Sequence, residues 1–276
     1  MLNLGQKNKL TVKRITAQGF YLADEEANEV LLPNKYIPDG LRVGDSIDVF
    51  IYKDSEDRII ATNLEPLIKL NEFAFLHVKQ VSAIGAFLDW GLEKDLFVPF
   101  REQNAKMMED GNYVVYLYLD TQTERLTGSN KINKFLSNEN LELRTGDEVN
   151  LLVFGKTELG YKVIINSKHE GLIYHNEIFQ PIKLGDSLKG FVKTIRDDNK
   201  VDIALQKQGF HNMDVNVQKI VAYMKDHNGQ IHLTDDSAPE EIAEVLNMSK
   251  KVFKKSIGIL YKKQLVNIQP DGVYLN

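Results

Sequence analysis

Short stretches in which apolar and polar residues alternate, the pattern of half-buried strands, run through the first three quarters of the chain. Three of these stretches begin with a glycine, at 19–22, 85–88 and 160–163. A second glycine follows each at near-constant distance, 25, 26 and 25 residues later, at Gly44, Gly111 and Gly185. The pattern therefore predicts three repeated units with one common layout.

Each second glycine is followed by an apolar strand, a polar turn and another short strand, over 47–61, 113–127 and 188–205. Several short strands in a unit of about 70 residues are typical of a small barrel rather than a parallel sheet. A domain of this size buries only about 60% of its unfolded surface, so an open sheet with exposed edges is a poor solution. We therefore expect each unit to close into a barrel.

The period becomes helical from about Asn212 onward. A first helix is predicted up to 228–229, a second from Ser237 through Leu246 with a proline in its first turn, and a third after Ser249. The segment 266–275 then reads as a hairpin around a Pro-Asp-Gly turn. Helix, short strand, helix, helix and hairpin is the order of a winged-helix domain.

Composition adds limits to this picture. The 276 residues include 34 Lys and Arg, 39 Asp and Glu and no cysteine, with a formal net charge of −5. Disulfides, thiolate metal sites and thiol catalysis are thereby excluded, and a reducing cytoplasm fits. The longest apolar run, Tyr113 to Leu119, is far shorter than the roughly 20 residues of a membrane helix. We expect no membrane insertion and no secretory signal.

Several segments carry a family resemblance. Gly-Ala-Phe-Leu-Asp-Trp-Gly at 85–91, Leu-Phe-Val at 96–98 and Leu-Gly-Asp at 184–186, followed by 201–205, resemble the S1-type RNA-binding OB barrel. With three such units and the lysine-rich segment 248–262, the whole chain resembles the bacterial conserved virulence factor B family. The string at 171–179, Gly-Leu-Ile-Tyr-His-Asn-Glu-Ile-Phe, is the most specific part of that match.

The resemblance implies a mainly β fold with a small α+β tail: three tandem S1-like OB-fold barrels of five strands, followed by a winged-helix domain. The expected domains are a degenerate barrel at 1–66, barrels at 67–138 and 139–208, and the winged helix at 212–276. The resemblance also implies a cytoplasmic RNA-binding regulator of gene expression that is not an enzyme.

Single strands are held by bases stacked on exposed aromatics, worth about 1 to 3 kcal/mol each, and by phosphates along a basic groove. In the S1 pattern the second residue after the glycine is an aromatic on that face, and the matched positions hold Tyr21, Phe87 and Lys162. A histidine of the next strand is matched to Leu32, Val98 and Tyr174, of which Tyr174 can stack. Barrel aromatics also serve as core, so burial decides between the two functions for these rings and for Trp90.

Basic residues in the last hairpin of each unit, Arg58, Arg125 and Lys200, are candidates for phosphate contact or ordinary solvated turn charges. Residues 1–66 and 67–142 each carry a net charge of −3, whereas 143–211 carries +1. Because phosphate contacts gain affinity through counterion release, we expect the third unit to bind best.

Four lysines of the third tail helix are further candidates. Lys250 with Lys254 and Lys251 with Lys255 have i, i+4 spacing, in a segment without acidic residues. In winged-helix proteins this helix commonly faces nucleic acid. The alternative is a solvated lysine face.

Enzyme signatures are thin: the sequence has no phosphate-cradling glycine loop, no His-Glu-x-x-His and no glycine-flanked nucleophile serine, and the six histidines are scattered. We therefore expect no catalytic site, cofactor or metal. The leading hypothesis is a non-catalytic protein that binds single-stranded RNA through several linked weak modules. The alternatives are a winged-helix regulator that binds duplex DNA, a protein-interaction scaffold with degenerate barrels, and a ribonuclease.

Overall fold

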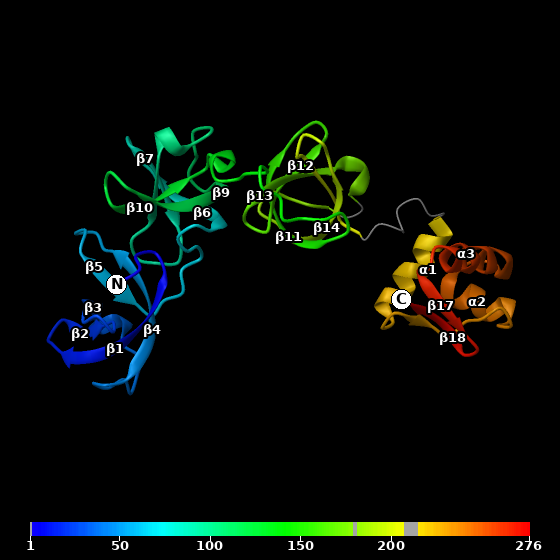
Figure 1. Ribbon diagram of the computed structural model, residues 1–276, viewed down its shortest axis with the longest axis horizontal. Coiled ribbons are helices and arrows are strands. Elements are labelled where there is room, and N and C mark those ends of the chain that lie inside the picture. The colour runs from blue at the N-terminus through cyan, green and yellow to red at the C-terminus, as the bar shows by residue number, and fades with distance from the viewer. Residues whose placement is uncertain (1, 179–180, 207–214) are drawn as a thin grey trace.

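The computed structural model describes residues 2–178, 181–206 and 215–276. The last residues of the predicted third barrel, the first residues of the predicted winged-helix domain and Phe179 of the 171–179 string lie outside these ranges. Three β units and a helical unit follow one another along the chain (Figure 1). The expected mainly β architecture, with three barrels and a winged helix, is confirmed.

The first unit is a closed barrel in which the strands pair in the order β1-β2-β3-β5-β4. The contact between β3 and β5 is parallel and closes the ring. The strands are β1 Lys7–Ile15, β2 Gly19–Ala23, β3 Glu29–Pro33, β4 Ser46–Lys53 and β5 Ile59–Thr62.

The third unit repeats this closed topology in the order β11-β12-β13-β15-β14, with β13 and β15 parallel. Its strands are β11 Glu148–Lys156, β12 Gly160–Ile165, β13 His169–Tyr174, β14 Ser187–Ile195 and β15 Val201–Ala204.

The second unit is a curled sheet in the order β10-β9-β6-β7-β8. Its two outer strands, β10 and β8, lie side by side, but among the described residues no strand pairing joins them. Side chains fill this seam, where a Cβ at Gly128 of β10 would press against Val98 and Leu96 of β8. Its strands are β6 Phe73–Val81, β7 Gly85–Asp89, β8 Leu96–Pro99, β9 Asn112–Asp120 and β10 Arg125–Ser129.

The repeated glycine has one structural reason in all three units. A Cβ placed on Gly19, Gly85 or Gly160 would overlap the carbonyl oxygen of Leu32, Val98 or Ile173 on the neighbouring strand. A bulge recurs seven residues earlier in the first strand of each unit, between Val12 and Arg14, Val78 and Gln80, and Val153 and Gly155. These devices bend the sheet so that short strands can curl into a barrel.

The tail contains three helices and a small sheet. They are α1 Val215–Asp226, β16 Gln230–Ile231, α2 Pro239–Leu246, α3 Lys250–Lys262, β17 Val266–Gln269 and β18 Gly272–Leu275. One face of α3 packs Phe253, Ile257 and Leu260 into a core shared with α1 and α2. Ser249 caps α3 by accepting from the Val252 amide at 3.3 Å, whereas the residue that caps α2 is Ala238 rather than Ser237. The Ser237 hydroxyl instead accepts from the Thr234 amide.

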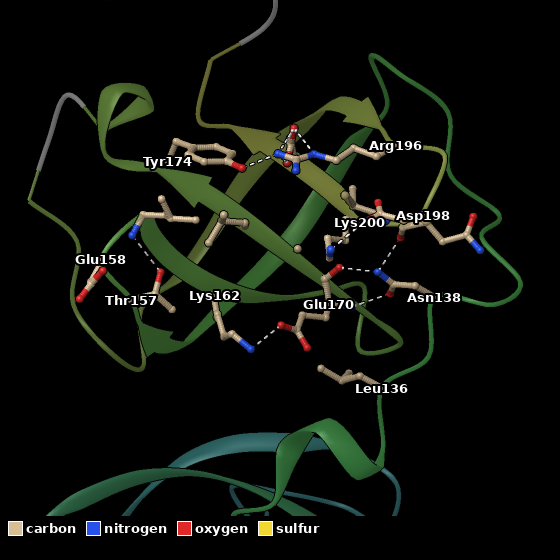
Figure 2. A pocket seen from close by; sticks show the side chains of 16 residues that line it. Leu136, Asn138, Thr157, Glu158, Lys162, Glu170, Tyr174, Arg196, Asp198 and Lys200 are labelled. Carbon is tan, nitrogen blue, oxygen red and sulfur yellow. Dashed lines mark hydrogen bonds and ion pairs between the residues drawn. The ribbon is translucent and has the colours of Figure 1, made fainter.

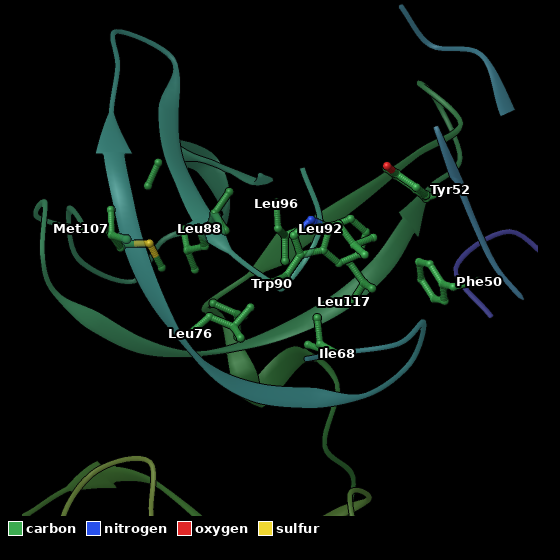
Figure 3. Close-up of a cluster of buried hydrophobic side chains, with 14 of the residues drawn as sticks. Phe50, Tyr52, Ile68, Leu76, Leu88, Trp90, Leu92, Leu96, Met107 and Leu117 are labelled. Atoms are coloured by element: carbon green, nitrogen blue, oxygen red, sulfur yellow. The ribbon is translucent and has the colours of Figure 1, made fainter. Parts of the chain in front are cut away.

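The first two barrels share one hydrophobic core (Figure 3). Trp90 of the second barrel is 3% exposed and meets Phe50 and Tyr52 of the first barrel edge to face, with ring centroids 5.9 and 6.2 Å apart. Ion pairs surround this core, among them Arg125 with Asp57 and Lys53 with Glu124. The two barrels therefore form one packed body.

A second, smaller cluster joins the second and third barrels. Val114 and Ile132 pack with Ile164, while Phe73 and Phe154 lie partly buried beside them. The amide of Ser137 donates to the Lys168 carbonyl, and Nδ1 of the buried His169 lies 2.6 Å from the Ser137 carbonyl oxygen. The segment between the two barrels is thus held against the third.

The shared core makes a testable prediction. Phe50→Ala should cost about 3 kcal/mol or more, because it truncates a buried ring. Trp90 is the only tryptophan, so its fluorescence reports on the second barrel. We expect the urea midpoint measured by this fluorescence to fall by roughly 1 M or more, although the substitution lies in the first barrel.

Leu151→Ala is the matched control, because Leu151 is buried in the core of the third barrel. It should leave the fluorescence midpoint unchanged. A midpoint unaffected by Phe50→Ala would show that the first barrel does not stabilise the second.

Candidate nucleic-acid interface

A depression of about 790 Å³ lies on the outer face of the third barrel (Figure 2). It brings together three residues that the sequence predicts as binding residues: Lys162, Tyr174 and Lys200. We call it the third-barrel pocket; its main lining residues are Lys162, Glu170, Leu172, Tyr174, Arg196 and Lys200. Its volume is in the range of small-molecule sites, about 300 to 1,000 Å³.

Strand β13 supplies one wall of the pocket through Glu170, Leu172 and Tyr174. Residues two apart in a strand share a face, so these half-exposed side chains alternate with the buried His169, Gly171 and Ile173. Lys162 of β12 lies opposite Leu172, and its ammonium is 2.7 Å from the Glu170 carboxylate. Gly160 lies opposite Tyr174, so no side chain from β12 occupies the position beside that ring.

The strand register corrects one residue match made from the sequence. Leu32 and Val98 pair with the residue after the motif glycine, and in the third barrel this partner is Ile173, not Tyr174. Tyr174 is equivalent to Pro33 and Pro99, which pair with Gly19 and Gly85. Pro33, Pro99 and Tyr174 each lie 14 residues after their glycine, so the match of Tyr174 with Leu32 and Val98 was out of step by one residue. The third barrel thus has an aromatic ring where the other two have proline.

Arg196, at the end of β14, connects Tyr174 to Asp202. Its guanidinium donates to the Tyr174 hydroxyl and makes hydrogen bonds of 2.9 to 3.1 Å to the Asp202 carboxylate. The hydrogen bond to Asp202 raises the pKa of Arg196 above its ordinary value, and the hydrogen bond to Tyr174 raises it further. The Tyr174 ring is therefore held by its hydroxyl, the guanidinium carbon of Arg196 lies 5.8 Å from the ring centroid, and the residue is half-exposed.

The other side of the pocket is formed by the β14–β15 hairpin and by the segment that precedes the third barrel. Lys200 donates to Asp198 at 2.6 Å, and this hydrogen bond lowers the pKa of the Asp198 carboxyl. Asn138 donates to the carbonyls of Glu170 and Asn199 and accepts from the Glu170 amide, each at 2.9 Å. Asn138 thereby fixes the preceding segment against the rim.

The second barrel has a comparable depression of about 780 Å³, which includes the predicted residues Phe87 and Arg125. Phe87 and Phe97 are half-buried, with ring centroids 5.1 Å apart. Arg125 pairs with Asp57 of the first barrel, and Asp120, on the other side of the same hairpin turn, pairs with Arg101 at 2.9 Å. Trp90 lines this depression, but its side chain is buried, which agrees with a role in the hydrophobic core rather than in base stacking.

The predicted residues of the first barrel lie apart from both depressions. The Arg14 guanidinium lies 3.6 Å above the centre of the Tyr21 ring and also binds Glu29. Arg58 forms ion pairs with Asp54 at 2.7 Å and Glu56 at 3.0 Å. One face of Tyr21 and the charge of Arg58 are thus already engaged within the barrel.

The four predicted lysines of α3 fall into two pairs. Lys250 donates to the Ser237 carbonyl at 2.9 Å, and Lys254 lies 3.2 Å from Asp235. Lys251 and Lys255 are exposed and form no ion pair with any residue that the structure describes. The i, i+4 pair Lys251 and Lys255 is therefore the part of the helix best able to meet an anionic partner.

Sequence reasoning missed Glu170, Arg196 and Asn138. Arg196 lies in the predicted 188–205 hairpin, directly before its turn, and that position was a usable signal. Glu170 and Asn138 are 32 residues apart and meet only because the segment before the third barrel runs along β13. No local pattern indicates that contact.

Within residues 2–178, 181–206 and 215–276, no three or more His, Asp or Glu side chains are grouped as metal ligands would be. Over the same residues, every helix is too short or too polar to cross a bilayer.

Comparison with known proteins agrees with this architecture. Residues 4–64 match the S1 domain family, and residues 218–275 match the CvfB-like winged helix domain. The chain is 28% identical to conserved virulence factor B of Staphylococcus aureus, over 86% of this chain and 81% of that protein. It is also 28% identical to the uncharacterized protein YitL of Bacillus subtilis, over 98% and 93% of the two chains. The resemblance to the conserved virulence factor B family is thus confirmed.

A solved structure aligns over nearly the whole chain. It is a multidomain protein with nucleic acid binding domains from Streptococcus pneumoniae, 20% identical, with 99% of this chain and 98% of that chain covered and a TM-score of 0.45.

Proposed function

We propose that this relative of the conserved virulence factor B proteins binds single-stranded RNA without catalysing its cleavage, and that the third-barrel pocket is the principal contact site. The observation that carries the proposal is the meeting of a partly exposed ring, Tyr174, with Lys162, Arg196 and Lys200 in one depression. Aromatic platforms beside cationic side chains are the means by which OB folds hold single strands.

The differences among the barrels support this choice of site. The third barrel has a tyrosine where the first two have proline, and it belongs to the unit with a net charge of +1 rather than −3. In the first barrel Arg14 covers one face of Tyr21, and in the second Arg125 is paired with Asp57. We therefore propose secondary roles for Tyr21, Arg58, Phe87 and Arg125.

The tail adds a second contact through α3. Lys251 and Lys255 are exposed on a helix without acidic residues, which suits a phosphate backbone. Weak contacts on linked modules raise the total affinity by orders of magnitude when both can engage one strand. This linkage reconciles nucleic-acid binding with a net charge of −5. From the resemblance we further propose a regulator of gene expression that works in the cytoplasm.

One binding series tests the proposal directly. Filter binding of single-stranded RNA, duplex RNA and duplex DNA is measured with the full chain across a range of salt concentrations. We expect single-stranded RNA to bind most tightly, with an affinity that falls as salt rises. Displacement of bound RNA by an equal concentration of duplex DNA would favour the DNA-binding alternative instead.

Tyr174→Ala should weaken binding of single-stranded RNA by roughly 5- to 150-fold, because the loss of one stacked base costs about 1 to 3 kcal/mol. Tyr174→Phe keeps the ring and should retain most of the affinity. Tyr21→Ala is the matched control in the first barrel and should change affinity less than threefold or so. Equal effects of the alanine substitutions in the two barrels would contradict the assignment to the third barrel.

Changing Lys250, Lys251, Lys254 and Lys255 together to Ala should weaken RNA binding and flatten its salt dependence. Each lost phosphate contact on a single strand removes about 0.7 from the slope of log affinity against log salt. Lys251→Ala with Lys255→Ala should produce most of this change, while Lys250→Ala with Lys254→Ala, whose ammonium groups are already engaged, should produce little. A salt slope unaffected by the fourfold change would refute a role for α3.

A further inference from the structure

The cations of the third-barrel pocket are each paired with a carboxylate. Lys162 pairs with Glu170, Arg196 with Asp202 and Lys200 with Asp198, at 2.7, 2.9 and 2.6 Å. A phosphate that entered the pocket would meet these carboxylates as well as the cations. A nucleobase carries no net charge, and its edge presents both donors and acceptors. The charge pattern therefore fits a base inside the pocket, with phosphates along its rim.

The pair formed by Lys162 and Glu170 lies on the barrel strands and is partly accessible. Their side chains are 34% and 32% exposed, so neither is sealed by the other, whereas the more exposed pair of Lys200 and Asp198 lies on the β14–β15 hairpin. The ammonium supplies hydrogen-bond donors only, and the ionised carboxylate supplies acceptors only. In contrast, both oxygens of Asp202 are already engaged by Arg196. A ligand edge beside Lys162 and Glu170 thus meets one donor group next to two acceptor oxygens.

The surface between these charges and Tyr174 is apolar. Leu172 lies directly opposite Lys162 and midway along β13 between Glu170 and Tyr174. Leu136 lies beside Glu170, on the other side of that carboxylate from the strand (Figure 2). A base that lies flat against Leu172 would direct its edge toward Lys162 and Glu170, while a neighbouring base stacks on Tyr174. Residues four apart in a strand are about 13 Å apart, so these two places serve different nucleotides.

We propose that Lys162 and Glu170 make this pocket selective for guanine in a single strand, an inference that rests on the proposed RNA binding. Guanine is the base whose pairing edge has two adjacent donors, the N1–H and the N2 amino group, beside one acceptor, O6. The two donors match both carboxylate oxygens of Glu170, and O6 faces the Lys162 ammonium. Uracil would place a carbonyl against a carboxylate oxygen, and adenine and cytosine each have a single donor group on this edge.

The test uses the full chain and fluorescence anisotropy. Its probes are a short oligouridylate and the same strand with one central guanine, adenine, cytosine or inosine. We expect the guanine strand to bind roughly tenfold more tightly than the others, as one bidentate base contact supplies. Inosine lacks the N2 amino group and should bind with an intermediate affinity. Because these strands are compared on the unaltered protein, the result does not depend on whether a variant folds.

Glu170→Gln replaces one acceptor oxygen by a donor and should reduce the guanine preference to about twofold or less. Glu148→Gln is the matched control, since Glu148 forms an ion pair with Lys189 at 2.6 Å and is not among the residues that line the pocket. It makes the same change in net charge and should retain the full preference. Loss of the preference in both variants would overturn the assignment to Glu170.

The outcomes separate this inference from the function on which it rests. Equal affinity for all strands in the unaltered protein would refute guanine selection and leave RNA binding intact. Failure of every strand to bind would refute the proposed function itself. A guanine preference that is lost in Glu170→Gln but kept in Glu148→Gln would support both the guanine selection and the proposed RNA binding.

Discussion

The candidate site depends on a close approach of two strands that only glycine permits. At Gly160 the backbone of β12 comes so near the Ile173 carbonyl that any side chain would overlap it. That approach curls the sheet, and it places Tyr174 opposite a residue without a side chain. The same approach at Gly19 and Gly85 forms the other two barrels, where proline occupies the place of the tyrosine. One constraint thus forms all three barrels, and the residue opposite the glycine distinguishes them.

The barrels differ further in what their surfaces already contact. The first barrel directs its β4–β5 hairpin toward the second, where Asp57 meets Arg125 and the Asp54 carbonyl accepts from Lys94 at 2.5 Å. The corresponding hairpin of the third barrel instead lines the pocket through Arg196 and Lys200. The same hairpin therefore serves domain packing in the first barrel and lines a candidate binding surface in the third.

The pocket is lined by three cations and four carboxylates, so its charge is slightly negative rather than positive. The carboxylates paired with these cations limit the attraction of phosphate to the site, because like charges repel. Such a site gains selectivity from the donors and acceptors it presents, while long-range attraction is left to exposed lysines such as Lys251 and Lys255. In the proposed function, the pocket thus supplies base stacking and selection, and the exposed lysines of α3 supply long-range attraction.

The amino-acid sequence by itself determined the repeat, the three β units and the winged-helix order, because alternation, helical periodicity and turn glycines are local properties of the chain. It also indicated Lys162, Tyr174 and Lys200, which the structure brings into one pocket. Only the tertiary structure decided the burial of Trp90 between two barrels, the pairing of Arg125 with Asp57 and the contact of Asn138 with Glu170. These features arise from contacts between segments far apart in the chain, and such contacts leave no signature in local spacing.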